Sequence, residues 1–574
     1  MNSEWFYRTL TATEEIERDE LAQELAISPA ICTLLLQRGI KTAESARHFF
    51  RPQLHDLHDP YLMKDMDKAV SRLNQAMGQK EKILVYGDYD VDGTTAVSLV
   101  YRFLRNFYTQ LDYYIPDRYD EGYGISTKGI DYAKEKGITL IIALDCGIKA
   151  IENVRYAKEK DIDFIICDHH TPDKELPDAA AILDPKQPDD SYPFQHLSGC
   201  GVGFKFMQAF AINNQLDVYT HLYPLLDLVA VSIASDIVPI YDENRILAYH
   251  GLKQLNNNPS IGLQAIIDLC GLRDKEKTIS DIVFKIGPRI NASGRMMCGK
   301  EAVDLLTARD IHTAREKSQS INRYNENRKE LDKKTTDEAN MLIQQIENLS
   351  DYKSIVVYNE TWHKGVIGIV ASRLTELYYR PAVVLTLSNG VATGSARSIQ
   401  GFDVYRAIES CKDIIENFGG HTFAAGLSLK VENIDAFKQR FEAFVAKHIT
   451  PDQRTPILEI DTQLDFRDIT PKFFKCLKQL SPFGPGNNKP LFATKRVYDY
   501  GTSRLVGKDQ EHIKLELVDS KSENIMNGIA FGMHQHNEYI KGFNPFDISY
   551  HIEENNYNGN SSIQLLIKEI RPSE

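Results

Sequence analysis

From about residue 80, short apolar runs alternate with amphipathic stretches in this 574-residue chain. The runs ILVY (83–86), LIIAL (140–144) and FIIC (164–167) are each bounded by polar residues, and TTAVSLVYRFLRNF (94–107) has helical spacing of its apolar positions. Continuous apolar strands separated by helices predict a parallel sheet covered on both faces. Ligands of such sheets bind beyond the carboxyl ends of the strands, so functional side chains are expected there.

The remaining pattern divides the chain further. Residues 1–75 predict short helices, and the first α/β domain is expected over 76–300. Residues 301–350 are highly charged with a sparse apolar stripe and no Pro or Gly, which predicts a long connecting helix. An α/β pattern returns over 351–450, and 451–574 shows short alternating segments typical of a small β-barrel. The expected fold is therefore two α/β domains joined by a long helix, followed by a barrel.

Composition narrows the class of protein. Hydrophobic residues make up 42% and charged residues 26%, as in ordinary globular proteins. No apolar run reaches the roughly 18 residues of a membrane span, and the N-terminus lacks a secretory pattern. The eight cysteines form no CxxC pair, which argues against a zinc ribbon or a disulfide framework. Reduced thiols in a cytoplasmic protein without a membrane segment are expected.

The net charge of −13 argues mildly against a nucleic-acid partner, because such proteins usually carry a basic patch. Two considerations weaken this objection. A site rich in carboxylates adds negative charge that bound metal ions neutralise. The local field at a binding groove is also not reported by the net charge.

The strongest local signal is VYGDYDVDGTT (85–95), which places Asp88, Asp90 and Asp92 at alternate positions after a predicted strand. Alternation directs these carboxylates to one face, and crowding them is costly unless cations neutralise them. An EF-hand calcium loop also begins D-x-D-x-D-G. Its twelfth position needs Glu, but Leu99 stands there, and the preceding segment is a strand.

Acidic or imidazole residues follow three further apolar segments. Asp145 ends 140–144 in ALDCG, Asp168, His169 and His170 end 164–167 in CDHHT, and Asp236 ends a long apolar segment in ASDIVP. Singly, each is more often a helix cap or a structural residue. Together they predict a metal site in which carboxylates with one imidazole favour Mn²⁺ or Mg²⁺ over Zn²⁺. Two ions about 3.5–4 Å apart can clamp a phosphate for hydrolysis.

In this order, DYDVDGTTA, ALDCG, CDHH, ASDIVP and GPRINASGRM resemble the five motifs of the DHH phosphoesterase superfamily, most clearly its RecJ branch. Pyrophosphatases of the superfamily carry a ligand His where Tyr86 stands here, which favours the nuclease branch. The resemblance implies a catalytic role for His170 near the scissile phosphate, as acid or electrostatic stabiliser, and for Asp145 as the bridging ligand. Asp88 is expected beside the first metal. The implied metal ligands are Asp90, Asp92, Asp145, His169 and Asp236.

Three polar segments could bind phosphate, although each could also be an ordinary polar loop. They are GPRINASGRM, ATGSARSIQGFD and GGHTFAAG, and the last two resemble the DHHA1 domain. In the RecJ branch, arginines and a Ser–Arg pair hold the 5′-terminal phosphate. The positions that this implies here are Arg118, Arg289, Ser395 and Arg397, and the other candidates are Asn291, Arg295, Gly420 and His421.

The resemblance implies a 5′→3′ exonuclease, specific for single-stranded DNA, that releases 5′-mononucleotides in recombination and repair. It also implies two Mn²⁺ or Mg²⁺ ions, a barrel of the oligonucleotide-binding (OB) type, and work as a monomer beside a helicase and a single-strand-binding protein. A purely architectural barrel remains open. So do a DHH-type oligoribonuclease or cyclic-dinucleotide phosphodiesterase, and a non-catalytic replication scaffold of the Cdc45-like kind.

Overall fold

The computed structural model describes residues 3–522, 524–557 and 560–573. They form two compact units. The first consists mainly of residues 59–236 and 251–456, and the second of residues 4–58, 237–250 and 457–574. Most of the N-terminal helical segment therefore belongs to the same unit as the C-terminal barrel.

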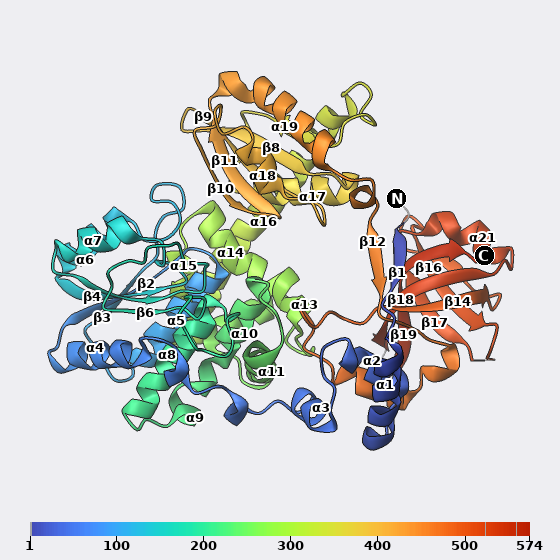
Figure 1. The fold of residues 1–574 in the computed structure, drawn as a ribbon, viewed down its shortest axis with the longest axis horizontal. Helices are drawn as coiled ribbons and strands as arrows, with labels where there is room; N and C mark the ends of the chain where they lie inside the picture. Colours follow the sequence, from blue (N-terminus) through green and yellow to red (C-terminus); the bar gives the residue numbers. More distant parts are fainter. Residues whose placement is uncertain (1–2, 523, 558–559, 574) are drawn as a thin grey trace. The chain divides into compact units, whose positions relative to one another are not determined.

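A five-stranded parallel sheet forms the centre of the first α/β domain (Figure 1). Its strands, in spatial order, are β3 (Leu111–Tyr114), β2 (Lys82–Gly87), β4 (Ile138–Leu144), β5 (Asp163–Cys167) and β6 (Ala181–Leu183). Helices α6 (Thr127–Lys136) and α7 (Ile151–Lys158) cover one face, and α5 (Val91–Leu104) and α8 (Gly199–Asn213) contact the other. The predicted strands and sheet are thus confirmed, and all carboxyl ends lie at one edge.

Helices complete this domain beyond the sheet. They are α4 (Met66–Gly78), α9 (Val218–His221), α10 (Leu226–Ser235), α12 (Ile261–Leu269), α13 (Ile279–Asp281) and α14 (Gly287–Met296). Helix α11 (Asp242–Asn257) begins in the second unit and ends in the first. The segment Val218–Ser235 is long and apolar enough to span a membrane by composition, with a mean hydropathy of 1.3. However, 61% of it is buried inside the protein, as in the core helix of a globular domain.

The long connecting helix is shorter than predicted. Residues 301–350 were expected to be continuous, but the structure has α15 (Lys300–Leu306) and then α16 (Ile311–Gln344). The break occurs because Asp310 caps α16, its carboxylate accepting the Thr313 N–H at 2.8 Å. Part of the apolar stripe of α16 is buried, at Ala314, Ile321 and Ala339, whereas Leu342 near its end is exposed.

The second α/β domain contains a five-stranded mixed sheet in the order β10-β11-β9-β8-β7. Helix α17 (Ile367–Tyr378) and the end of α16 pack against β7 and β8 on one face. Helices α18 (Val404–Glu409) and α19 (Ile434–His448) cover the opposite face. The strands are β7 (Ile355–Tyr358), β8 (Ala382–Ser388), β9 (Val391–Arg397), β10 (Asn417–His421) and β11 (Ala424–Leu429).

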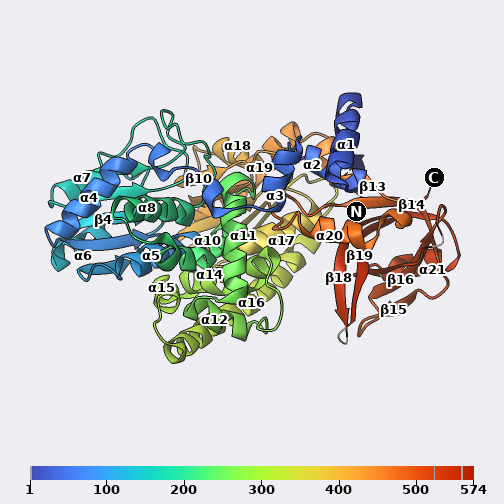
Figure 2. The ribbon, with the colours of Figure 1, turned by 90° about the horizontal axis from the view of Figure 1, so that it is seen from below.

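A seven-stranded sheet forms the predicted barrel, which an additional β14–β16 pairing closes. Figure 2 shows β18 and β19 running side by side as its long hairpin. The strands are β13 (Thr462–Gln463), β14 (Phe492–Asp499), β15 (Arg504–Val506), β16 (His512–Asp519), β17 (Met526–Ala530), β18 (Phe546–Tyr557) and β19 (Asn560–Pro572). Two short helices, α20 (Pro471–Lys478) and α21 (Asn537–Lys541), lie between them in sequence.

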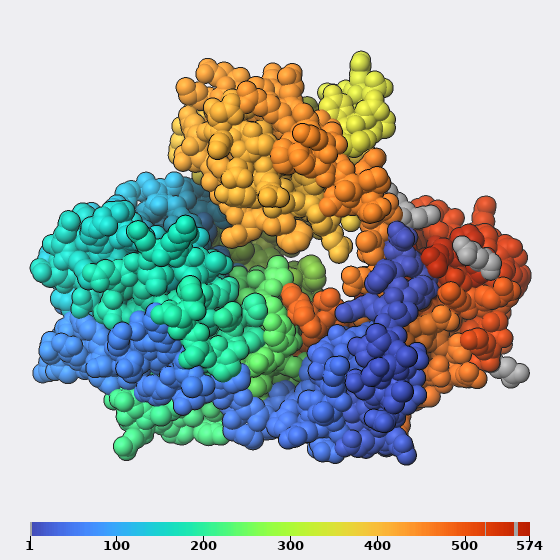
Figure 3. All heavy atoms as spheres, in the orientation of Figure 1, coloured from blue at the N-terminus to red at the C-terminus, as the bar shows by residue number. Residues whose placement is uncertain are grey.

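The N-terminal segment shares the apolar core of the barrel, and the two form a continuous surface (Figure 3). It contains α1 (Ala12–Leu25), α2 (Pro29–Leu36) and α3 (Ala43–Phe50). The prediction of helices alone missed β1 (Glu4–Tyr7), which pairs in parallel with β12 (Ile457–Ile460). Such a short strand forms only because a distant part of the chain provides its hydrogen-bonding partner.

Candidate active site

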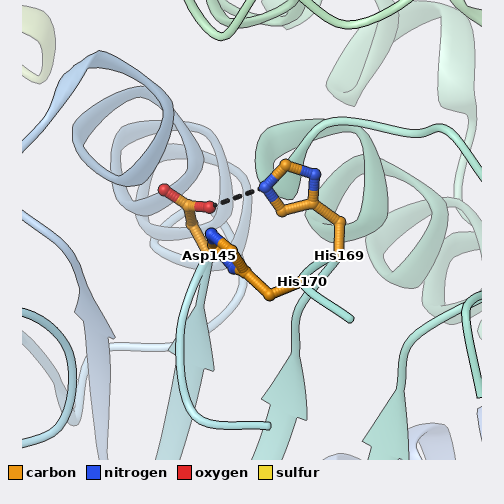
Figure 4. A group of neighbouring side chains, drawn as sticks. All are labelled: Asp145, His169 and His170. Atoms are coloured by element: carbon orange, nitrogen blue, oxygen red, sulfur yellow. Dashed lines mark ion pairs between the residues drawn. The ribbon is translucent and has the colours of Figure 1, made fainter. Parts of the chain in front are cut away.

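Carboxylates from several segments meet around one imidazole. His169 Nε2 lies 3.1 Å from Asp145 Oδ1 and 3.7 Å from both Asp92 Oδ2 and Asp236 Oδ2. Figure 4 shows Asp145 and His169 pointing toward one another from the ends of neighbouring strands, β4 and β5. Two groups of side chains could each hold a metal ion, because the possible ligand atoms within each group all lie within 4.8 Å of one another. The first group is Asp145, His169 and His170, and the second is Asp92, His169 and Asp236.

Helix α8 begins directly against this cluster. The Asp92 carboxylate accepts the Gly199 and Cys200 N–H groups at 2.7 and 2.8 Å and the Ser232 hydroxyl at 2.7 Å. The positive end of the α8 dipole thereby stabilises the buried charge. A Cβ at Gly199 would lie 2.6 Å from Asp145 Cβ, so only glycine permits this approach. Gly199 was not a predicted site residue, and its signal was the glycine-rich GCGVG at the start of α8.

The first acidic motif contributes two further carboxylates. Asp90 caps α5 by accepting the Gly93 N–H at 3.0 Å. Asp88 is fully buried, and its Oδ1 accepts the Gly124 N–H at 3.2 Å. Its Oδ2 has no hydrogen-bond partner among the described residues. Burying a carboxylate oxygen without a partner is costly, and a bound cation would provide the missing partner.

The electrostatics of the carboxylate cluster also favour bound cations. Burial, and then the charges of Asp92, Asp90 and Asp236, raise the pKa of Asp145 well above its usual range. Burial followed by Asp92 and Asp90 raises the pKa of Asp236 to about 8. Crowded carboxylates of this kind repel one another unless cations neutralise them. Because the donors are oxygens with a single imidazole, the set fits Mn²⁺ or Mg²⁺.

His170 is engaged at both ring nitrogens. Its Nδ1 lies 2.7 Å from Asp168 Oδ1, and its Nε2 lies 3.1 Å from the Tyr123 hydroxyl. The Tyr123 hydroxyl donates its one proton to the Asp145 carbonyl at 3.0 Å, so it accepts from His170 Nε2–H. Both nitrogens therefore carry protons. Burial lowers the pKa of His170, but the bond to Asp168 outweighs it and raises the pKa to about 9. A protonated His170 is unsuited to ligate a metal and suited to contact a phosphate.

Asp168 and Tyr123 have roles beside His170 that the sequence did not reveal. Asp168 also accepts the Ile148 N–H at 2.9 Å, and its pKa falls to about 2 because the bond to His170 overcomes burial. Tyr123 lies between Gly122 and Gly124, whose φ angles are 86° and 82°. These left-handed glycines allow the tight loop that brings Tyr123 over the site. The EGYG sequence was the available signal.

Arginines gather between the two α/β domains of the first unit. Arg295 Nη1 donates to the Gly365 carbonyl at 3.2 Å. Burial, and then Arg118, Arg328 and Arg397, lower the pKa of Arg295 to about 10. Such a cluster of cations favours a polyanionic ligand. Of these residues, Arg328 on α16 was not predicted.

The other predicted substrate residues are arranged differently. Arg397 Nη1 donates to Ser395 Oγ at 2.8 Å, so this predicted pair is brought together. Arg289 is instead engaged locally, with the Lys285 carbonyl and Asn322 Oδ1 at 2.7 and 3.0 Å. Three further residues were predicted to bind substrate. Asn291 is half-buried on α14, His421 is exposed at the end of β10, and Gly420 lies beside it.

Comparison with known proteins decides the family. The chain is 38% identical over 556 residues to the single-stranded-DNA-specific exonuclease RecJ of Bacillus subtilis, covering 96% of this chain and 69% of that protein. It is 32% identical to the RecJ of Haemophilus influenzae, covering 90% and 92% of the two chains. The chain belongs to the RecJ family. Residues 82–233 match the DHH family N-terminal domain, 351–447 the DHHA1 domain and 460–569 the RecJ OB domain.

Solved RecJ structures confirm the fold. The structure of RecJ with Mn²⁺ from Thermus thermophilus aligns with a TM-score of 0.85 at 25% identity, covering 100% of this chain and 80% of that one. A second exonuclease RecJ, bound to manganese, aligns with a TM-score of 0.59 at 30% identity, covering 68% and 96%. Both relatives hold Mn²⁺, in agreement with the donor set assembled around His169.

Proposed function

We propose that this chain is a 5′→3′ exonuclease that hydrolyses single-stranded DNA to 5′-mononucleotides with two Mn²⁺ or Mg²⁺ ions. The observation that carries the proposal is the crowding of buried carboxylates around His169 in a chain of the RecJ family, with one Asp88 oxygen that has no hydrogen-bond partner in the described part of the chain. The cluster needs cations, and its relatives are named as single-stranded-DNA-specific exonucleases.

The side chains of the cluster have two proposed roles, to hold the ions and to present a cation to the phosphate. Bound ions would supply an activated hydroxide and neutralise charge on the phosphate. His170, held protonated between Asp168 and Tyr123, presents a cationic ring to the phosphate or to the leaving oxygen. The residues that would hold the ions are Asp90, Asp92, Asp145, His169 and Asp236, with Asp88 beside them.

The arginine cluster supports the proposed polarity. A terminal phosphate carries more negative charge than an internal one, so buried guanidinium groups favour it. Holding that phosphate at a fixed position would place the first phosphodiester bond at the metal centre. The proposed phosphate contacts are Arg118, Arg295, Ser395 and Arg397, completed by Arg289, Asn291, Gly420 and His421.

The match to the RecJ OB domain favours a polymer over a dinucleotide as substrate, because OB barrels bind extended single strands. It therefore weighs against the oligoribonuclease and cyclic-dinucleotide alternatives, while the metal-binding side chains weigh against a non-catalytic scaffold. We further propose a cytoplasmic monomer that works beside a helicase and a single-strand-binding protein, as the family resemblance implies.

The test is Mn²⁺-dependent digestion of one 3′-labelled oligonucleotide, single-stranded or annealed, with and without a 5′-phosphate. We expect stepwise loss from the 5′ end of the single strand only. Asp145→Asn should abolish digestion, whereas Asp178→Asn, whose side chain is 86% exposed, should not. Full activity of Asp145→Asn would contradict the metal assignment. No digestion by wild-type protein shown to bind Mn²⁺ would favour a small-nucleotide phosphodiesterase.

A further inference from the structure

One loop of the first α/β domain carries two residues of the proposed site. The loop joins β3 to α6, and Arg118 and Tyr123 lie on either side of Glu121 within it. Arg118 belongs to the arginine cluster, since burial and then the charge of Arg118 lower the pKa of Arg295. The Tyr123 hydroxyl contacts His170 Nε2 at 3.1 Å. The arginine cluster and the His170 imidazole are therefore both in contact with this short segment.

The Glu121 carboxylate closes the loop at its base. It accepts the Asp117 N–H at 2.8 Å and the Ser126 hydroxyl. The Tyr114 hydroxyl also donates to it and lies 3.0 and 3.1 Å from its two oxygens. Tyr114 is the last residue of β3, and Ser126 caps α6 by accepting the Gly129 N–H at 2.9 Å. Glu121 thus ties the loop to the strand before it and to the helix after it.

Most other contacts of the first half of the loop are internal or exposed. Asp117 Oδ1 accepts the Tyr119 and Asp120 N–H groups at 2.8 and 3.0 Å, which forms a local turn. Asp120 pairs with Lys128 on α6, but the two side chains are 66% and 57% exposed. An exposed ion pair contributes little, whereas hydrogen bonds to a carboxylate are among the strong ones. Glu121 is therefore the strongest link from this half to β3 and α6.

The position of Tyr123 depends on both ends of a flexible stretch. Tyr123 lies between two glycines with φ angles of 86° and 82°, which permit several backbone conformations. The glycine after it accepts the Tyr86 hydroxyl at its carbonyl at 3.0 Å. The glycine before it follows Glu121 directly and donates its N–H to the Asp117 carbonyl at 3.2 Å. Loss of the Glu121 contacts would release one of these two ends.

We infer that Glu121 is a positioning residue for both Arg118 and Tyr123, so that recognition of the 5′ end and orientation of the catalytic imidazole share one support. The inference rests on the proposed function, because it takes the ligand of the arginines to be the 5′-phosphate of a single DNA strand. It adds to that function a residue whose own hydrogen bonds reach neither His170 nor an arginine.

The test is Glu121→Ala, assayed on a single strand with a 5′-phosphate and on the same strand with a 5′-hydroxyl. Displacement of Tyr123 should lower kcat on both strands roughly 10- to 100-fold, as for a catalytic group that moves by about 1 Å. Displacement of Arg118 should raise KM roughly ten-fold for the phosphorylated strand only, because that strand loses a charged contact. Asp120→Ala, the control, removes the same charge from an exposed neighbour and should behave as wild type.

A milder variant covers the case in which Glu121→Ala does not fold. Tyr114→Phe removes one donor to the carboxylate and keeps the ring that stacks on Tyr86, with the ring centres 5.4 Å apart. The same two effects are expected at smaller size, with the melting temperature and the affinity for Mn²⁺ near wild type.

Two variant backgrounds separate positioning from a merely structural role. Glu121→Ala should lose its kcat penalty when added to Tyr123→Phe, and its KM penalty when added to Arg118→Ala. Wild-type kinetics of Glu121→Ala, an equal loss of kcat on both strands without a change in KM, or penalties that persist in both backgrounds would each overturn the inference. Wild-type protein that digests neither strand would instead refute the proposed function, so the two can fail separately.

Discussion

The contact between Tyr123 and His170 makes a quantitative prediction. In Tyr123→Phe, the ring remains but the hydroxyl that accepts from His170 Nε2 at 3.1 Å and donates to the Asp145 carbonyl at 3.0 Å is lost. Asp168 still holds Nδ1 at 2.7 Å, so the imidazole can turn about one remaining bond. We expect kcat to fall while the KM for single-stranded DNA and the affinity for Mn²⁺ stay near wild type.

The size of the expected fall in kcat follows from the hydrogen bond that Tyr123→Phe removes. A bond to a charged group contributes about 1.5–3 kcal/mol, which corresponds to a fall in kcat of roughly 10- to 150-fold. Loss of the whole His170 side chain should cost more, about 10²- to 10⁴-fold if it acts as a general acid. Tyr123→Phe should therefore lie between wild type and His170→Ala.

A double-variant cycle tests whether Tyr123 acts through His170. Single-turnover digestion of a 5′-phosphorylated strand is measured for both single variants and for the double variant. If Tyr123 positions His170, adding Tyr123→Phe to His170→Ala should cost less than about 3-fold. The same penalty in both backgrounds would refute the positioning role and would assign Tyr123 a separate contact.

Two further predictions concern the stability of the unit that contains the barrel. Arg245→Ala should lower its free energy of unfolding by about 1–3 kcal/mol, because the buried guanidinium donates to the Phe49 and Leu480 carbonyls, each at 2.9 Å, and alanine leaves these acceptors without a donor. Urea titration beside the exposed control Arg47→Ala checks this, and equal midpoints would contradict it. Burial lowers the pKa of His551 to about 4, so the native state resists protonation that the unfolded state accepts. Stability should therefore fall by up to about 3 kcal/mol as the pH drops from 6.5 to 4, and His551→Gln should remove that slope in pH-dependent melting.

The sequence predicted the parallel sheet and the clustering of acidic side chains around His169 because both depend on local order. Apolar runs such as 140–144 and 164–167 are long enough to identify buried strands, and parallel pairing brings their carboxyl ends to one edge. Asp145 and His169 follow those strands directly, so sequence position alone placed them together. Asp236 also directly follows an apolar segment, although this segment is helix α10 and not a strand.

The remaining site depends on tertiary contacts that local patterns do not contain. Tyr123 lies 47 residues from His170 in sequence, and Gly199 matters only because α8 begins against Asp145. The arginines around Arg295 come from two domains and from α16, so only the folded structure brings them together. For this reason the sequence did not identify Arg328 as a site residue. Even the break before α16 rests on one side chain, Asp310, in a stretch without Pro or Gly.

The net charge of −13 is compatible with a DNA substrate because the acidic and basic side chains of the site form separate groups in the first unit. Asp88 and Asp145 are buried, 0% and 2% exposed, and burial raises the pKa of both. In the proposed function these carboxylates face metal ions, so a DNA strand would meet their complex and not their free charges. Arg295 and Arg397, in contrast, neighbour other arginines and are the residues to which the proposed function assigns the phosphate. Formal charge counts both groups equally, whereas the field that attracts a strand comes from the second.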